Sequence, residues 1–138
     1  MKAVLDANAL ISARISPKGT PARILEAAEE GGYELVVSQR LLAEVSEVLL
    51  RGKIQQYLPE KAVPVYLGRQ RSVAVLVDEA EDGTRYTEDP DDDYLVVLAL
   101  SSGAGKLISG DRHLLGLECE GLPVVLSPAE FLKYLDME

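Results

Sequence analysis

The chain has 138 residues, a length that suits one domain with a substantial buried core. Hydrophobic residues make up 47% and charged residues 27%, as in ordinary globular proteins, and no basic or long apolar stretch of a signal peptide or membrane span precedes Asp6. The net charge of −9 disfavours a general nucleic-acid binder, because such binding depends mainly on Lys and Arg. We therefore expect a single domain over residues 1–138, in the cytoplasm and without a membrane contact.

The single cysteine and the single histidine exclude further kinds of site. Cys119 has no partner for an internal disulfide, and a zinc site with several Cys or His ligands would need more than Cys119 and His113. His113 follows the charged pair 111–112, where a solvent-facing side chain is the ordinary role. A catalytic triad built on this histidine is therefore disfavoured.

The first part of the chain alternates between strand and helix patterns. Residues 3–5 form an apolar run typical of a buried parallel strand, and residues 7–13 have a helical pattern. The next helix begins near Pro21 and ends at a pair of glycines. Residues 34–37 predict a second strand, after which Ser38 is suited to cap a third helix.

The middle of the chain carries weaker signals. Residues 59–70 predict a helix that Pro64 weakens, because proline lacks the backbone N–H of a helix interior. Residues 73–77 predict a third strand, and the polar residues 78–88 form the longest expected loop.

The last third returns to strong periodic signals. Residues 94–104 predict a helix, and residues 107–108 and 123–126 predict two more strands. Ser127 and Glu130 have the spacing of a capping box at the start of a final helix. Strands joined by helices imply right-handed crossovers, so we expect a three-layer α/β/α fold with a mostly parallel sheet of about five strands.

Four acidic residues lie where these elements begin or end. Asp6 and Asp111 follow apolar strands, Asp92 lies near the start of a helix, and Glu44 borders the apolar face of another. The carboxyl ends of parallel strands share one edge of a sheet, where ligand sites form. Clustered carboxylates repel unless protonated or bound to a cation, so this pattern predicts a site for Mg²⁺ or Mn²⁺.

Each of the four acids also has a structural interpretation. Asp6 and Asp92 could be helix caps, Glu44 a solvated boundary residue, and Asp111 the start of a turn. Taken singly, the structural role is the commoner one for all except Asp6, which ends a buried strand. Taken together, the convergence of four acids on one edge favours the metal site.

At these residues the chain resembles the PIN-domain family of metal-dependent nucleases, and most of all its branch of toxin components of toxin–antitoxin systems, with the VapC-type ribonucleases as relatives. The resemblance covers nearly the whole chain. The matching motifs, in order, are residues 4–13, 38–44, 89–93, 109–115 and 128–132.

The resemblance implies an acidic quartet that binds Mg²⁺ or Mn²⁺, made of Asp6, Glu44, Asp92 and Asp111. Asp93 is the alternative to Asp92, which is favoured because Leu95 and Ala99 follow it at the family's spacing. The supporting polar residues would be Asn8 and Ser109.

The expected reaction is hydrolysis of RNA phosphodiester bonds by a metal-activated water. Arg14, Lys18, Arg40 and Arg112 are candidates to hold substrate phosphates. The resemblance also implies a homodimer and a cognate antitoxin protein that blocks the acidic edge with a basic side chain.

Two other functions remain open from the sequence. A phosphohydrolase could use Asp6 as its nucleophile, although such enzymes typically have a second Asp two residues later, where this chain has Asn8. A non-catalytic, metal-stabilised module that binds a partner protein would also fit, because metal ligands alone do not establish turnover.

Overall fold

The sheet has five strands that are all parallel, in the order β3-β2-β1-β4-β5. The computed structural model describes residues 1–77, 90–111 and 121–137, and only the backbone of residues 90–92. Within these ranges the strands are β1 (Lys2–Leu5), β2 (Glu34–Val37), β3 (Val75–Leu76), β4 (Lys106–Ile108) and β5 (Val124–Leu126).

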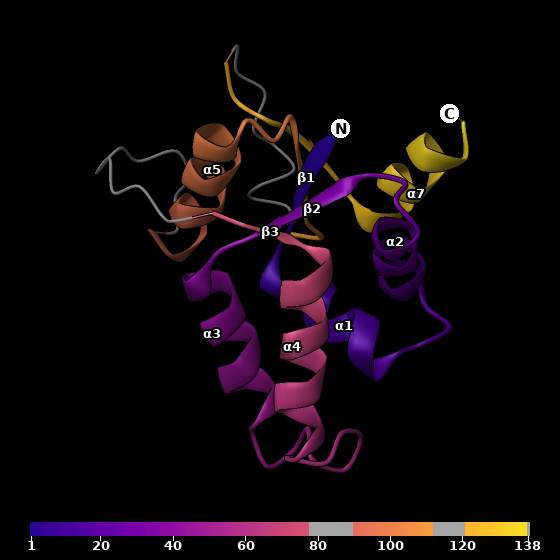
Figure 1. Cartoon of the computed structure of the whole chain (residues 1–138), viewed down its shortest axis with the longest axis vertical. Coiled ribbons are helices and arrows are strands. Elements are labelled where there is room, and N and C mark those ends of the chain that lie inside the picture. Colours follow the sequence, from indigo (N-terminus) through magenta and orange to yellow (C-terminus); the bar gives the residue numbers. More distant parts are fainter. Residues whose placement is uncertain (78–89, 112–120, 138) are drawn as a thin grey trace.

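Helices cover both faces of this sheet. The described residues contain α1 (Ala7–Ile15), α2 (Thr20–Glu29), α3 (Gln39–Leu49), α4 (Ala62–Val73), α5 (Pro90–Ser102) and α7 (Pro128–Asp136). Figure 1 shows α5 on one side of the strands, where it packs on β1, β2 and β4, and α1, α3 and α4 on the other side. The α1 helix contacts α2 and α3, and α7 contacts α2 and β5. The three-layer α/β/α fold with a parallel sheet is confirmed.

The centre of the sheet explains why its strands are wholly apolar. Val4 in β1 pairs with Val36 of β2 on one side and Leu107 of β4 on the other, and all three side chains are fully buried. A strand covered by helices on both faces has no solvent-facing side, so it shows a continuous apolar run instead of alternation. This packing places the end of β1 in the middle of the sheet edge.

The two helix caps that the sequence predicts are confirmed. The Ser38 hydroxyl accepts a hydrogen bond from the backbone N–H of Leu41 at 3.1 Å, at the start of α3. At the start of α7, the Ser127 hydroxyl accepts from the N–H of Glu130 at 3.2 Å, and the Glu130 carboxylate accepts from the N–H of Ser127 at 3.0 Å. These contacts satisfy backbone donors that a helix start leaves unpaired.

The boundaries of two expected helices are wrong. The helix expected at 59–70 begins three residues later and runs on through Val73, so β3 keeps only two of the residues expected at 73–77. Pro64 does not weaken this helix, because it lies in the first turn, where a backbone N–H has no intrahelical partner. The helix expected at 94–104 begins at Pro90, also a first-turn proline. The loop expected at 78–88 lies outside the described residues.

No helix in the described ranges combines the length and the apolar composition needed to cross a membrane.

A buried amide in α4 is the least satisfied group of the described core. The Gln70 side chain is only 1% exposed, yet neither its Nε2 nor its Oε1 has a hydrogen-bond partner within the part of the chain that the structure describes. Burying an amide without a partner costs about 1–3 kcal/mol. Gln70 should therefore lower the stability of the fold.

We expect Gln70→Met to raise the free energy of unfolding by about 1 kcal/mol, because it removes the unpaired amide while keeping an unbranched side chain of similar size. Denaturant unfolding followed by circular dichroism measures this change. Gln70→Ala is the matched control and should lower stability, since it removes packing atoms as well. A lower stability of the Met variant would show that the amide makes a stabilising hydrogen bond.

Candidate active site

Asp6 is held rigidly where β1 ends and α1 begins. Asp6 is 5% exposed and is the N-cap residue of α1. Oδ1 accepts a hydrogen bond from the backbone N–H of Ala9 at 2.8 Å, and Oδ2 accepts one from the hydroxyl of Ser109 at 2.6 Å. Because each carboxylate oxygen has a partner from a different element, the orientation of Asp6 is determined by both the helix start and the neighbouring strand.

Strand β4 supplies the neighbours of Asp6. Leu5 and Ile108 are partners in the parallel register, so the residues that follow these two strands lie side by side. The Asp6 N–H donates to the carbonyl of Ile108 at 3.0 Å. The fully buried Ser109 donates a hydrogen bond from its hydroxyl to Asp6, and the same hydroxyl oxygen accepts one from the N–H of Asp111 at 3.0 Å. One hydroxyl therefore connects two acidic residues at the same edge.

Asp111 and Glu44 both lie close enough to Asp6 to affect its pKa. Burial raises the pKa of Asp6 above its ordinary value of 3.8, and the charges of Asp111 and Glu44 raise it further. The hydrogen bonds from Ser109 and Ala9 act in the opposite direction. Among the described residues, the groups that shift this pKa include no cation. The acids Asp6, Glu44 and Asp111 thus give this partly desolvated site a surplus of negative charge.

Glu44 reaches this edge from α3, and a residue of α5 contacts it. Glu44 is half-buried, and its Oε2 accepts a hydrogen bond from the hydroxyl of Tyr94, which is 8% exposed. The guanidinium carbon of Arg40 lies 4.2 Å from the centre of the Tyr94 ring. A small pocket is lined by Arg40, Ala43, Glu44, Glu47 and Tyr94. The sequence analysis missed Tyr94, for which the only signal is its place directly after the aspartate run.

The third-motif aspartates are described only in part. Asp92 lies in the first turn of α5, as expected, but its side chain is outside the described part of the structure. Asp93 is described, and its side chain is 7% exposed. Within the described residues, no three Asp, Glu, His or Cys side chains form a ready metal-binding group. The structure therefore brings Asp6, Glu44 and Asp111 into the same region without a preformed cage.

The remaining predicted residues lie in different places. Asn8 is exposed in the first turn of α1, and Arg40 lies in the first turn of α3 beside Tyr94. Arg14 is in the last turn of α1, about 12 Å along the helix axis from Asp6. The structure therefore does not bring Arg14 to the carboxylates. Arg112 lies outside the described residues.

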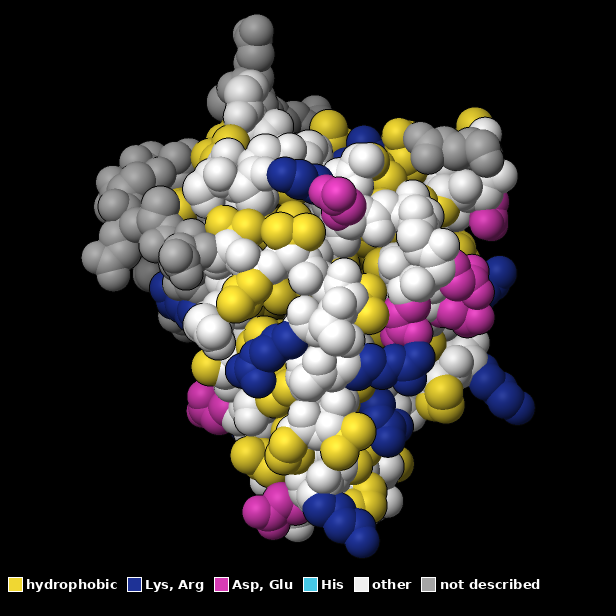
Figure 2. All heavy atoms as spheres, viewed as in Figure 1, with side chains coloured by type: hydrophobic (Ala, Val, Ile, Leu, Met, Phe, Trp, Pro, Cys, Tyr) yellow, Lys and Arg dark blue, Asp and Glu magenta, His cyan; other side chains and the backbone are white. Residues whose placement is uncertain are grey.

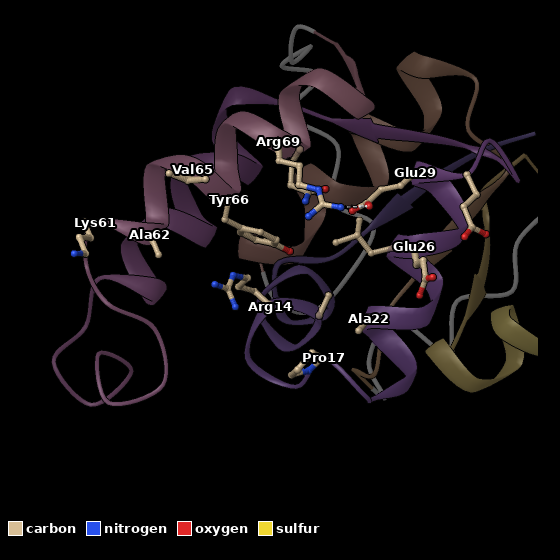
Figure 3. A pocket seen from close by; sticks show the side chains of 14 residues that line it. Arg14, Pro17, Ala22, Glu26, Glu29, Lys61, Ala62, Val65, Tyr66 and Arg69 are labelled. Atoms are coloured by element: carbon tan, nitrogen blue, oxygen red, sulfur yellow. Dashed lines mark hydrogen bonds and ion pairs between the residues drawn. The ribbon is translucent and has the colours of Figure 1, made fainter.

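A separate groove lies at the far end of α1, between α1, α2 and α4. In Figure 3, Tyr66 and Arg69 reach from α4 toward α1 and α2, with Arg14 near the ring. The Tyr66 hydroxyl donates to the carbonyl of Leu10 at 2.6 Å, and Arg69 forms an ion pair with Glu29 at 2.5 Å. Figure 2 shows acidic side chains over α2 and basic ones over α4 on this face. These contacts pair groups across the groove and link α4 to the helices beside it.

Comparisons with known proteins agree with this architecture. The sequence matches the PIN domain family over residues 2–113. It is 31% identical over 121 residues to the uncharacterized protein MJ1680 of Methanocaldococcus jannaschii, a match that spans 87% of this chain and 77% of that protein.

Two solved structures are similar in fold. PAE2754 from Pyrobaculum aerophilum superposes with a TM-score of 0.70 at 17% sequence identity, over 100% of this chain and 91% of that chain. A chain of VapBC2 from Rickettsia felis, solved bound to a DNA fragment from the promoter, has a TM-score of 0.66 at 13% identity, over 92% of this chain and 98% of that chain. At these identities the likeness concerns the fold.

Asp6→Asn should stabilise the protein in the absence of divalent metal. An Asn side chain can keep both hydrogen bonds, because its oxygen still accepts from Ala9 and its amide donates to Ser109. The folded pKa of Asp6 is raised, so below 3.8 the acid is protonated in both states, and its destabilising effect develops as pH rises through the folded pKa. The melting temperature of the variant should therefore exceed that of wild type at neutral pH, by roughly 4 °C for each kcal/mol gained.

Thermal unfolding in a chelator, followed from pH 3 to pH 8, measures this difference. It should shrink toward zero at the acidic end. Asp136→Asn, at an exposed position in α7, serves as the control and should change little. An equal gain at every pH would contradict the role of ionisation.

Proposed function

Because the chain belongs to the PIN-domain family, we propose that it is a metal-dependent endoribonuclease whose site comprises Asp6, Glu44, Asp111 and a carboxylate of α5. The observation that carries the proposal is the position of the Ser109 hydroxyl, which donates to Asp6 and accepts from the N–H of Asp111, so that both acids lie at one edge of the sheet. The carboxyl ends of parallel strands are the usual place for a ligand site. In addition to burial, the charge of Glu44, from α3, raises the pKa of Asp6.

The donor atoms of this site suit a hard divalent cation. Carboxylate oxygens with water are the ligands that Mg²⁺ and Mn²⁺ prefer, and a like-charged cluster needs a counter-charge to ionise fully. When bound, such an ion would lower the pKa of a water molecule and stabilise the charge on the oxygens around phosphorus. Asp6, Asp111 and the α5 carboxylate would hold it, and Glu44 would hold a second ion or orient the water.

The contacts of Asp6 fit a metal ligand. Its two oxygens accept one hydrogen bond each, from Ala9 and Ser109, which orients the carboxylate and leaves a further lone pair on each oxygen for an ion. Ser109 acts in this proposal by orienting Asp6, as the partners of metal ligands generally do. The phosphohydrolase alternative, with Asp6 as nucleophile, has less support because Asn8 stands where such enzymes typically have a second Asp.

The α5 carboxylate is either Asp92 or Asp93. The spacing to Leu95 and Ala99 supports Asp92, whereas the burial of Asp93 supports Asp93, because a buried acid is seldom without a specific role. Both lie near the N-terminus of α5, where the helix dipole favours negative charge. Separate substitution of the two residues distinguishes them.

RNA would be held mainly through its phosphates. Arg40 is described beside the carboxylate cluster, and Arg112 follows Asp111 directly in the sequence. Arg14 would contact only a substrate that extends along α1. The chain has no Trp, one Phe and 6 Tyr, so stacking of bases on aromatic rings is not obviously provided, and shape or loop contacts would select the RNA.

The proposed partners are a cognate antitoxin and a second copy of the chain. The fold is shared with a protein of the VapBC2 complex, which supports a toxin role, and a basic side chain from an antitoxin could neutralise the acidic edge. The α3 and α4 region offers Tyr57 and Val65, which are 62% and 73% exposed, as apolar surface for a homodimer. Leu41 and Leu42 of α3 pack inside the protein and are not part of this surface.

We expect purified protein to cleave RNA in Mg²⁺ or Mn²⁺, and Asp6→Asn to abolish this cleavage. Changing the partner of a metal ligand typically costs about 10–100-fold in activity, so loss of a ligand should cost about 100-fold or more. The same loss is expected for only one of Asp92→Asn and Asp93→Asn. Gel analysis of labelled RNA measures the rates, with Asp136→Asn as the control. Equal cleavage by wild type and Asp6→Asn would contradict the nuclease assignment and leave the non-catalytic module.

Metal binding should be visible without any RNA. Mn²⁺ should raise the melting temperature of wild type, because a ligand that binds only the folded state stabilises it by about 2.7 kcal/mol at 100 times its dissociation constant. Asp6→Asn, which we expect to be more stable without metal, should gain little from the ion. A melting curve at increasing Mn²⁺ tests this. An equal Mn²⁺ response in both proteins would place the ion elsewhere.

A further inference from the structure

One hydrogen bond joins the two helical layers across the acidic edge. Tyr94 belongs to α5, on one face of the sheet, and Glu44 belongs to α3, on the other face (Figure 1). The Tyr94 hydroxyl donates to Oε2 of Glu44, which is 50 residues away in the sequence. This contact is separate from the Ser109 hydroxyl, which holds Asp6 from the sheet.

We propose that Tyr94 is the positioning residue for Glu44, holding its carboxylate toward Asp6 so that Glu44 can act in the site. The inference rests on the proposed nuclease function and adds a residue with a defined role to it. Tyr94 contacts neither metal nor substrate in this proposal. It acts only through Glu44.

Glu44 needs such a partner because of where its backbone lies. Its Cα is on α3, whereas Asp6 lies between β1 and α1, so Glu44 comes to the site from a different element. That side chain is half-buried and has several rotatable bonds, so fixing its carboxylate in one orientation costs conformational entropy. A fixed hydrogen bond to Oε2 removes much of this freedom in advance, which is the purpose of the partners that surround metal ligands.

The chemistry of a phenol suits this task better than that of a cation. A carboxylate has about four acceptor positions, so one hydrogen bond at Oε2 leaves Oε1 and a further lone pair for an ion or a water. A neutral donor also leaves the negative charge of Glu44 intact. Lys or Arg in the same place would neutralise the carboxylate and weaken its attraction for a metal.

The ring of Tyr94 is also restrained by its surroundings. Tyr94 is 8% exposed, and the Arg40 guanidinium lies over its ring with the carbon 4.2 Å from the ring centre. Arg40 and Glu44 are one helical turn apart on α3, so they contact the face and the hydroxyl of the same ring. Positive charge over an aromatic face is attractive, which adds to the restraint on the ring.

A first experiment tests the contact itself, independently of any activity. The chain has 6 Tyr and no Trp, so its emission comes from tyrosine. A hydrogen bond from a phenol to a carboxylate quenches that emission. Glu44→Ala should therefore increase the tyrosine emission of the wild-type protein, and it should leave the emission of the Tyr94→Phe variant unchanged. Equal brightening in both backgrounds, or none in either, would overturn the proposal, whatever the protein catalyses.

A second experiment measures Mn²⁺ affinity by calorimetry and RNA cleavage in the same proteins. Tyr94→Phe removes only the hydroxyl and should weaken both by about tenfold. In a Glu44→Ala background, the same change should have no further effect, because a residue that acts through Glu44 has nothing left to position. Tyr33→Phe is the matched control, since it deletes a buried hydroxyl that donates to the carbonyl of Ile24 at 2.9 Å, away from the acids. It should leave Mn²⁺ affinity unchanged.

The outcomes separate this inference from the proposed function. If Tyr94→Phe matches wild type, or if its effect persists at full size in Glu44→Ala, Tyr94 only packs α5 on α3 and the inference is wrong. If wild type and Asp6→Asn are alike in metal binding and cleavage, the nuclease assignment fails and this inference fails with it. If Asp6→Asn loses function while Tyr94→Phe retains it fully, only the inference fails.

Discussion

The hydrogen bond from Ser109 to Asp6 is the contact on which the candidate site depends. It joins the carboxyl ends of β1 and β4, which are neighbours only because the strand order puts them side by side. The same hydroxyl accepts from the N–H of Asp111, so one serine places two acids at one edge. Without this contact the Asp6 carboxylate would keep the hydrogen bond from Ala9 of its own helix, and the direction of its second oxygen would not be set.

The site is built at the expense of stability. Asp6 is an acid buried at the centre of the sheet edge, near two other acids, and its raised pKa shows that its ionised form is disfavoured there. A protein selected for stability alone would place an uncharged cap at this position. Retaining a charge in such surroundings is typical of functional sites, where strain and repulsion are relieved by the ligand.

The residues of the site come from both helical layers as well as from the ends of the strands. Asp6 and Asp111 follow strands, whereas Glu44 comes from α3 and its partner Tyr94 from α5. The ends of the strands therefore provide Asp6 and Asp111, whereas α3 provides the longer side chain of Glu44 and α5 provides the tyrosine that contacts it.

Local sequence patterns were sufficient to predict most elements, the caps at Ser38 and Ser127, and the positions of Asp6 and Asp111 after strands. These features depend on residues within a few positions of one another, so composition and spacing reveal them. Which side chains meet is decided by packing between distant segments. The partner of Glu44, the remoteness of Arg14 and the burial of Gln70, without a hydrogen bond to any described residue, could be found only in the folded structure. A helical pattern shows which face is apolar but not what that face will contact.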